Sequence, residues 1–241
     1  MALRSALSSL RAMAAESGAS IACLYLLHRL LLALRLGRVV PYALVAQPIG
    51  ADVYRATRDD PSTLVRRVGA EDPVALRFPR PPQVNAARWA AGADCHVCEV
   101  KNDFAGTIWI RRGAYDEDEV RCRFELVAPE TSVWDFDVYV EPRYRVGRTM
   151  ARMWKAVDRE LAAQGIRWSF SRISLFNGAS LRAHARLAAV IVGRAIFVQI
   201  GPLQLAWCKG TGPAWHASLP GSTGPTVRLD APAPRPQVNP K

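Results

Sequence analysis

The sequence has few acidic residues and few cysteines, and it lacks a long uninterrupted apolar segment. Asp and Glu number 21 against 32 Lys and Arg, so the 241-residue chain carries a formal net charge of +11. The five cysteines are odd in number and irregularly spaced, which argues against a disulfide framework and predicts a cytoplasmic protein. Half of the residues are apolar, which allows a sizeable core and excludes wholesale disorder.

The most apolar stretch, residues 19–36, is interrupted by His28, Arg29 and Arg35. A membrane-spanning helix needs about 20 largely uncharged residues, and no small-residue cleavage site follows as it would in a signal peptide. We therefore expect a helix that ends at Gly37. Two interpretations stay open: the helix packs on the core, or residues 19–38 lie at a membrane surface as an amphipathic helix.

One short motif, Cys95-His96-Val97-Cys98, resembles half of a structural zinc site. A structural zinc ion needs four ligands, and no second pair follows at a suitable spacing. We expect two cysteines on opposite faces of a strand and no metal site.

Positive charge is concentrated in residues 141–194, which contain eleven basic and three acidic residues. Both ends of the chain are also basic, whereas the remainder is net negative. Proteins that coat nucleic acid are more often basic throughout the domain. The distribution therefore predicts a local anionic ligand and argues against a nucleic-acid partner.

Hydrophobic periodicity and breaker residues predict a mixed α+β protein with three parts. Residues 1–40 are expected to be a helical extension, 41–208 the folded domain, and 209–241 a Pro/Gly-rich tail that is extended or disordered. We expect strands at 42–46, 121–127, 133–140, 166–174, 190–200 and 203–208, a hairpin over 95–111, and helices near 62–69, 86–91, 147–164 and 177–188.

The segment 133–188 runs from a strand through a proline and an arginine-rich turn into a helix, a strand and a helix capped by Asn177. A strand that leads directly into a helix N-terminus leaves unpaired backbone amides and a favourable dipole, which together bind pyrophosphate. Arg143, Arg145 and Arg148 lie at this point, and guanidinium groups form strong bonds to phosphate oxygens. The pattern predicts an anion site after Pro142.

This segment resembles the GNAT superfamily of N-acetyltransferases. Residues 140–145 (VEPRYR) are similar to the V-x-P-x-Y-R motif that leads into the family's acetyl-CoA loop. Residues 145–150 (RVGRTM) stand where the family's Q/R-x-x-G-x-G/A motif follows, with Arg148 and Met150 in place of two small residues. Further on, Asn177, Ser180 and Leu187 match the second signature, N-x-x-A/S-x-x-x-Y-x-x-L-G-F.

The resemblance implies a divergent bacterial GNAT protein with a twisted, mostly antiparallel central sheet flanked by helices. It also implies an acyltransferase that moves an acetyl or similar acyl group from acyl-CoA to an amine of a small-molecule or protein acceptor. The alternative is an inactive GNAT-like module that binds acyl-CoA or a protein partner. The residues that the resemblance places at acetyl-CoA are Val138, Tyr139, Val140, Arg145, Val146, Gly147, Arg148, Thr149, Met150, Asn177 and Ser180.

Three residues are candidates for proton transfer. Asp135 and Asp137 share one strand face by the period of two, and one of them, with Asp135 preferred, is the candidate base. The alternative is that the pair forms ion pairs with Arg172 or Arg145. His184 stands where the family often has a tyrosine that protonates the leaving thiolate, and the alternative is a core histidine.

Two other features bear on the site. The family separates two central strands at a bulge, so that a backbone N–H polarises the thioester carbonyl, and the resemblance places this near Val138–Val140. The acidic run 116–119 is expected to be an exposed turn, and such a run beside an acceptor site would attract a cationic amine.

Overall fold

The computed structural model describes residues 18–50, 54, 56–145, 148–210 and 212–232. Its strands are β1 (Gly37–Pro48), β2 (Thr63–Val68), β3 (Asp94–Val100), β4 (Asp103–Arg111), β5 (Ala114–Asp116), β6 (Arg123–Leu126), β7 (Ser132–Val140), β8 (Trp168–Ser174), β9 (Val190–Ile200), β10 (Leu203–Lys209), β11 (Trp215–Ser218) and β12 (Thr226–Leu229). Its helices are α2 (Ala19–Ala33), α3 (Pro82–Ala90), α4 (Thr149–Ala163) and α5 (Gly178–Arg186), with the 3-10 turns η2 (Pro73–Arg77) and η3 (Pro142–Tyr144).

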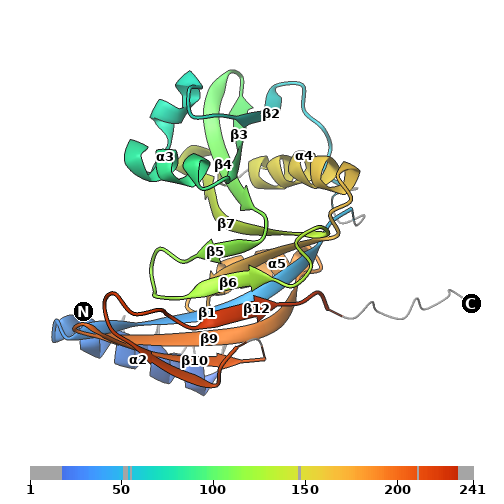
Figure 1. The fold of residues 1–241 in the computed structure, drawn as a ribbon. Coiled ribbons are helices and arrows are strands. Elements are labelled where there is room, and N and C mark those ends of the chain that lie inside the picture. Colours follow the sequence, from blue (N-terminus) through green and yellow to red (C-terminus); the bar gives the residue numbers. More distant parts are fainter. Residues whose placement is uncertain (1–17, 51–53, 55, 146–147, 211, 233–241) are drawn as a thin grey trace, which may run out of the picture.

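Two sheets organise the fold (Figure 1). The large sheet has nine strands in the order β11-β10-β9-β1-β8-β7-β4-β3-β2, and the small sheet has the order β12-β6-β5 within the described ranges. Every neighbouring pair of the large sheet is antiparallel except β7 and β8. The expected fold class, a mixed α+β protein with a mostly antiparallel sheet, is therefore confirmed.

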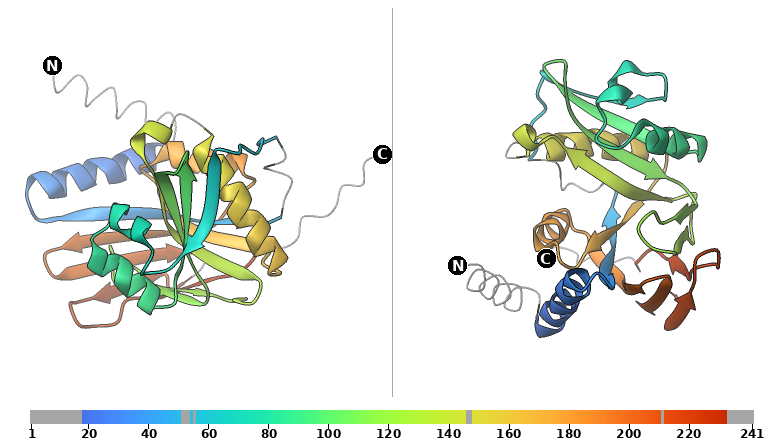
Figure 2. Two further views of the ribbon diagram at one scale, coloured as in Figure 1. Left: turned by 90° about the horizontal axis from the view of Figure 1, so that it is seen from above. Right: turned by 90° about the vertical axis from the view of Figure 1, so that its left-hand side faces the viewer.

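The two faces of the large sheet are covered differently (Figure 2). Helices α2, α4 and α5 lie on one face, and α3, η2 and the small sheet lie on the other. The larger part of the core fills the space between the two sheets, where the ring of Trp134 stacks on that of Phe124 at 4.9 Å. On the inner side of α4, the side chains of Met153, Trp154 and Val157 are fully buried, and their spacing puts them on one stripe of the helix.

Strand β1 is longer than the predicted 42–46 strand. It includes residues 37–40, which were expected to belong to the helical extension 1–40. Residues 39–46 are apolar almost without interruption and all are buried. Such a run is typical of a central strand covered on both faces. The expected helix at 19–36 is present as α2, which ends at Ala33. Three residues, 34–36, separate it from β1.

The expected helix near 62–69 is wrong, because these residues form β2. Thr63 and Val65 are β-branched, and β2 pairs with β3 along the whole of its length.

The predicted hairpin is confirmed as β3–β4, but its two-residue turn is at Lys101 and Asn102, with φ of 52° and 60°. Positive φ at both positions is the type I′ geometry that suits the twist of a hairpin.

The C-terminal segment 209–241 contains more structure than expected. Strand β11 pairs with β10, and β12 pairs in parallel with β6. Val227 and Leu229 are buried in the core between the sheets. The composition of this segment did not reveal β12 because its partner, β6, is supplied by a distant part of the chain. Strand β11 has only four residues and lies at the edge of the large sheet.

Candidate active site

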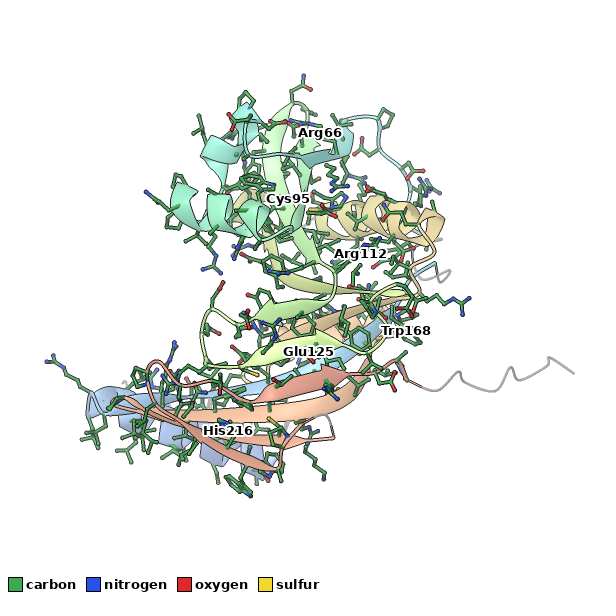
Figure 3. The ribbon with its side chains drawn as sticks, in the orientation of Figure 1. Arg66, Cys95, Arg112, Glu125, Trp168 and His216 are labelled. Atoms are coloured by element: carbon green, nitrogen blue, oxygen red, sulfur yellow. The ribbon has the colours of Figure 1, made fainter. Side chains whose placement is uncertain are left out.

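The parallel strands β7 and β8 separate after a short paired region. Their register runs through Ser132–Trp168, Val133–Ser169 and Trp134–Phe170 and, in the described residues, ends there. Trp168, labelled in Figure 3, therefore marks the paired end of β8. Beyond Trp134 the strand β7 is paired with β4 alone, so the backbone groups on its other edge face a widening gap.

A bulge in β7 lies beside this gap. Asp137 pairs with Trp109, and Asp135 pairs with the next residue, Ile110, so that Phe136 is the extra residue. The bulge is thus found two residues before the predicted position at Val138–Val140. The inserted residue also breaks the period of two, so Asp135 and Asp137 point to opposite faces of the sheet. The prediction that they share a face is wrong.

A groove of about 340 Å³ occupies the gap between the strands. Residues 135–138 of β7 form one wall and residues 171–174 of β8 form the other. Helix α5 closes one side through its N-cap Asn177, Ser180 of its first turn and His184 of its last turn, and the acidic run adds Asp118 and Glu119 on the other. The structure therefore brings together all three predicted proton-transfer residues with Val138, Asn177 and Ser180.

Asp135 is the buried carboxylate of the groove. Its side chain faces α4 and α5, its residue is 5% exposed, and its Oδ2 accepts a hydrogen bond of 2.7 Å from Ser169 Oγ. Burial raises the pKa of Asp135 to about 8, against the smaller opposing effect of the Ser169 hydroxyl. A carboxyl group with such a pKa exchanges its proton near neutral pH, which suits a general base.

His184 is held in the groove by α5. Asn177 begins this helix as its N-cap, with its Oδ1 accepting a 3.0 Å hydrogen bond from Ser180 N. The imidazole of His184 is buried, and its burial lowers its pKa, so the neutral form is favoured at pH 7. Its Nδ1 has no hydrogen-bond partner among the described residues. A buried, unpartnered nitrogen that lines a groove is available to a ligand.

Asp137 lies on the opposite face and is part of an ion-pair network. Its Oδ2 accepts bonds from Arg88 Nη1 at 2.8 Å and Arg80 Nε at 3.1 Å. The Arg88 guanidinium is also 5.1 Å from the centre of the Phe136 ring. Asp137 thus takes the ion-pair role foreseen as the alternative, although its partners are arginines of α3 and its N-terminal approach instead of Arg172 or Arg145.

The acidic run 116–119 is less exposed than predicted. The side chain of Glu117 is fully buried and forms a bidentate pair with Arg172 of β8. The carboxylate of Glu119 accepts a 2.6 Å hydrogen bond from the Tyr42 hydroxyl. Asp118 keeps 61% of its side chain exposed at the groove. Sequence reasoning missed this arrangement, since a run of four acids between short strands is typical of a solvated turn.

The expected acyl-CoA loop is described in part, since Val146 and Gly147 lie outside the described residues. Arg145 does not point away from the protein: its Nε donates to Val140 O at 2.8 Å, and its guanidinium lies over the Tyr139 ring. Arg148 is exposed at the first turn of α4, followed by buried Thr149. Met150 packs against the core beneath α4, beside Val140. Arg148 is therefore the arginine of this pair that remains available to an anion.

The motif Cys95–Cys98, which resembles half of a zinc site, lies within β3 as expected. Cys95 and Cys98 are buried in different core clusters on the two faces of β3, and His96 Nε2 lies 2.8 Å from Glu160 Oε2. Among the described residues, no three metal-ligating side chains come together.

No helix in the described ranges is long and apolar enough to cross a membrane.

Comparisons with known proteins give matches at the level of structure. No family model and no curated protein matches the sequence. A tandem GNAT protein from the clavulanic acid biosynthesis pathway is 12% identical over 71% of this chain and 57% of its own, with a TM-score of 0.46. An acetyltransferase assigned to the GNAT family from Novosphingobium aromaticivorans is 18% identical over 67% and 64%, with a TM-score of 0.42. An aminoglycoside N-acetyltransferase in complex with CoA is 16% identical over 55% and 90%, with a TM-score of 0.38.

These neighbours are GNAT-family acetyltransferases. The family that the sequence motifs resemble is therefore also the family of these solved structures. The sequence identity is low in each case.

Proposed function

We propose that this chain transfers an acyl group from acyl-CoA to an amine, with the thioester in the groove between β7 and β8. The observation that carries the proposal is the groove itself, in which a bulged strand edge, a buried carboxylate and an unpartnered imidazole meet. Two strands that stay paired would leave neither the space nor the free backbone groups that a thioester needs.

The groups around the groove fit an acyl-CoA. The free edge of β7 offers backbone N–H and C=O groups to an extended pantetheine-like chain. At the N-terminus of α4, the exposed side chain of Arg148 offers positive charge to a pyrophosphate, and the first turn of the helix offers unpaired backbone N–H groups. His184 Nδ1 is a buried polar atom of the groove that has no partner among the described residues, and a bound ligand would satisfy it.

Arg145 takes a different role in this proposal from the one the sequence implied. Its bond to Val140 O stabilises the turn between β7 and η3. The carbonyl that it binds is at the end of the strand that forms one wall of the groove. Arg145 is therefore a positioning residue, and we assign the phosphate contact to Arg148.

Acyl transfer forms a C–N bond and breaks a C–S bond, so one proton leaves the amine and one reaches the sulfur. We assign the first to Asp135, which accepts the proton directly or through a water molecule once it is ionised. The neutral imidazole of His184 carries one N–H, which can donate a hydrogen bond to the departing sulfur. A backbone N–H at the Phe136 bulge is suited to polarise the thioester carbonyl.

The acceptor amine is expected to approach from the face that carries α3 and the small sheet. A second cavity, of about 720 Å³, lies on that face and shares four residues with the groove: Arg80, Arg88, Asp118 and Phe136. The exposed carboxylate of Asp118 would attract an ammonium group to the shared boundary. The rest of the lining combines small apolar side chains at and around α3, such as Val84, Ala87 and Ala91, with polar ones such as Gln83 and Asp116.

Ligand binding is tested by thermal unfolding with acetyl-CoA, with CoA and without ligand. A ligand at 100 times its Kd stabilises the native state by about 2.7 kcal/mol, which is a measurable shift. We expect Arg148→Ala to reduce the shift strongly. Arg159→Ala is the matched control, because Arg159 is also an exposed arginine of α4 but lies near the other end of the helix. Absence of any shift at millimolar acetyl-CoA would remove the proposal.

Turnover is tested by following CoA release with a panel of amines. Asp135→Asn and His184→Phe are each expected to slow release by about 10²-fold or more while the acetyl-CoA shift persists. A protein that binds acetyl-CoA but releases no CoA with any amine would instead be the inactive binding module.

A further inference from the structure

An apolar surface on the face opposite the small sheet has no cover from the described part of the chain. The register places Val198 beside Leu205, Ile196 beside Trp207, and Trp207 beside Trp215, so these side chains point to one face of β9, β10 and β11. The alternating residues of the same strands point into the core between the sheets: Ala195, Phe197, Ala206 and Cys208.

Helix α2 extends this surface without covering it. It packs on β1, where Ile21 contacts the cluster of Ala43 and Val45. Ala43 pairs with Arg194 of β9, so α2 and the uncovered strands share one face of the sheet. Figure 2 shows α2 over β1, to one side of β9 and β10. The outer side of α2 and its C-terminal end expose Leu26, Leu27, Leu30 and Leu34, each by 40% or more.

The exposed part of this surface includes large side chains. Trp215 is 73% exposed, and its ring centre lies 6.5 Å from that of Trp207. Leu205 and Ile200 are 40% and 43% exposed. Monomeric proteins rarely expose a contiguous apolar patch of this kind unless it binds something. His216, labelled in Figure 3, shows where β11 lies, at the end of the molecule that carries α2.

All charged side chains of the surface are cationic. Residues 17–51 and 189–218 contain no Asp or Glu. Arg29 and Arg35 are exposed on and just after α2. Arg194 of β9 and Lys209 of β10 lie opposite each other in the strand register, on the apolar face of the sheet. A twofold-related copy of this chain would bring the same cations together, and that arrangement is repulsive. An anionic surface would attract all of them.

We propose that α2 and the outer face of β9–β11 together dock on a membrane surface that contains anionic lipids. Exposed leucines and isoleucines beside arginine and lysine are the composition of interfacial membrane-binding elements. Tryptophan is enriched at the boundary between hydrocarbon and headgroup, where its ring is buried and its N–H stays wet. Each Lys or Arg near an anionic surface contributes about 1 kcal/mol. In this proposal the described domain is held at the membrane surface from one side.

The proposal is tested by co-sedimentation of the full chain with vesicles. We expect binding to vesicles of phosphatidylcholine and phosphatidylglycerol in equal parts and much weaker binding to phosphatidylcholine alone. The double variant Arg194→Glu with Lys209→Glu should weaken binding about 10-fold or more. Leu205→Ser with Trp215→Ser should also weaken binding about 10-fold or more, at any salt concentration, because this variant removes apolar contact and no charge.

Two controls match these changes on distant surfaces. Leu76→Ser removes an apolar side chain that is 84% exposed on η2, between β2 and α3 at the opposite end of the molecule (Figure 1). Arg159→Glu reverses an exposed charge on α4. Both should bind as the unchanged protein does. Circular dichroism establishes that each variant is folded.

Three results would overturn the proposal. The first is no binding to anionic vesicles, and the second is equal loss of binding in the control variants. The third is a dimer in sedimentation velocity that the Leu205→Ser, Trp215→Ser variant dissociates, because a second copy would then cover this surface. Lipid binding is measured without substrate, so failure of this test leaves the acyl-transfer proposal untouched, and the converse also holds.

Discussion

The buried carboxylate of Asp135 makes stability depend on pH in a way that one substitution should abolish. Asn has nearly the same shape as Asp and can still accept the hydrogen bond from Ser169 Oγ, but it does not titrate. Asp135→Asn therefore removes the proton while it preserves the packing between β7 and β8.

The size of the effect follows from the pKa. Burial raises the pKa of Asp135 to about 8 in the folded protein, whereas an unfolded chain has a carboxyl pKa of about 3.9. Between these values the folded state holds one proton more than the unfolded state, so stability falls as the pH rises and stops falling above about pH 8. From pH 6 to pH 9 the wild-type protein should lose about 2–3 kcal/mol more than the Asn variant.

Urea unfolding of both proteins at pH 6, 7, 8 and 9 measures this difference. The Asn variant is the reference for every other titrating group, since those groups are unchanged. Parallel stability curves, within about 0.5 kcal/mol over this range, would show that Asp135 is ionised in the folded protein at neutral pH. The assignment of Asp135 as a base with a pKa near the working pH would then be wrong.

Three further predictions concern the elements that hold the groove. Gly106→Ala should destabilise the fold by about 1–3 kcal/mol in urea unfolding, since the added Cβ would lie 2.4 Å from Tyr139 O on β7; Gly113→Ala, which meets no atom within 4 Å but has a positive φ, is the control for backbone strain. Asn177→Ala should cost about 1 kcal/mol by the same measurement, because Ser180 N loses its cap, and Asn177→Ser should restore most of it. Met153→Ala should cost about 2–5 kcal/mol, because Met153 is fully buried beneath α4, and an effect below 1 kcal/mol would contradict the packing described for this helix.

The sequence alone determined the elements whose signals are local. Strands β7 to β10 and helices α4 and α5 were predicted within a few residues, because their apolar periods, Pro142, Gly165 and the Asn177 cap act within one element. The motifs in the same segment also directed attention to six residues that line the groove: Asp135, Asp137, Val138, Asn177, Ser180 and His184. Local patterns failed for β2 and β12, whose partner strands are distant in sequence, and for β11, a four-residue strand at the edge of the large sheet.

Tertiary structure decided which of the candidate residues can act. The bulge at Phe136 separated Asp135 from Asp137, because an inserted residue reverses the alternation that the sequence pattern assumes. Arg88 of α3 and Arg80, which precedes this helix, then paired with Asp137, whereas burial raised the pKa of Asp135 against the opposing effect of its hydroxyl partners. Likewise, the sequence of α2 does not show which of its leucines pack inward and which face outward. Only the position of β1 beneath the helix shows which of them remain exposed.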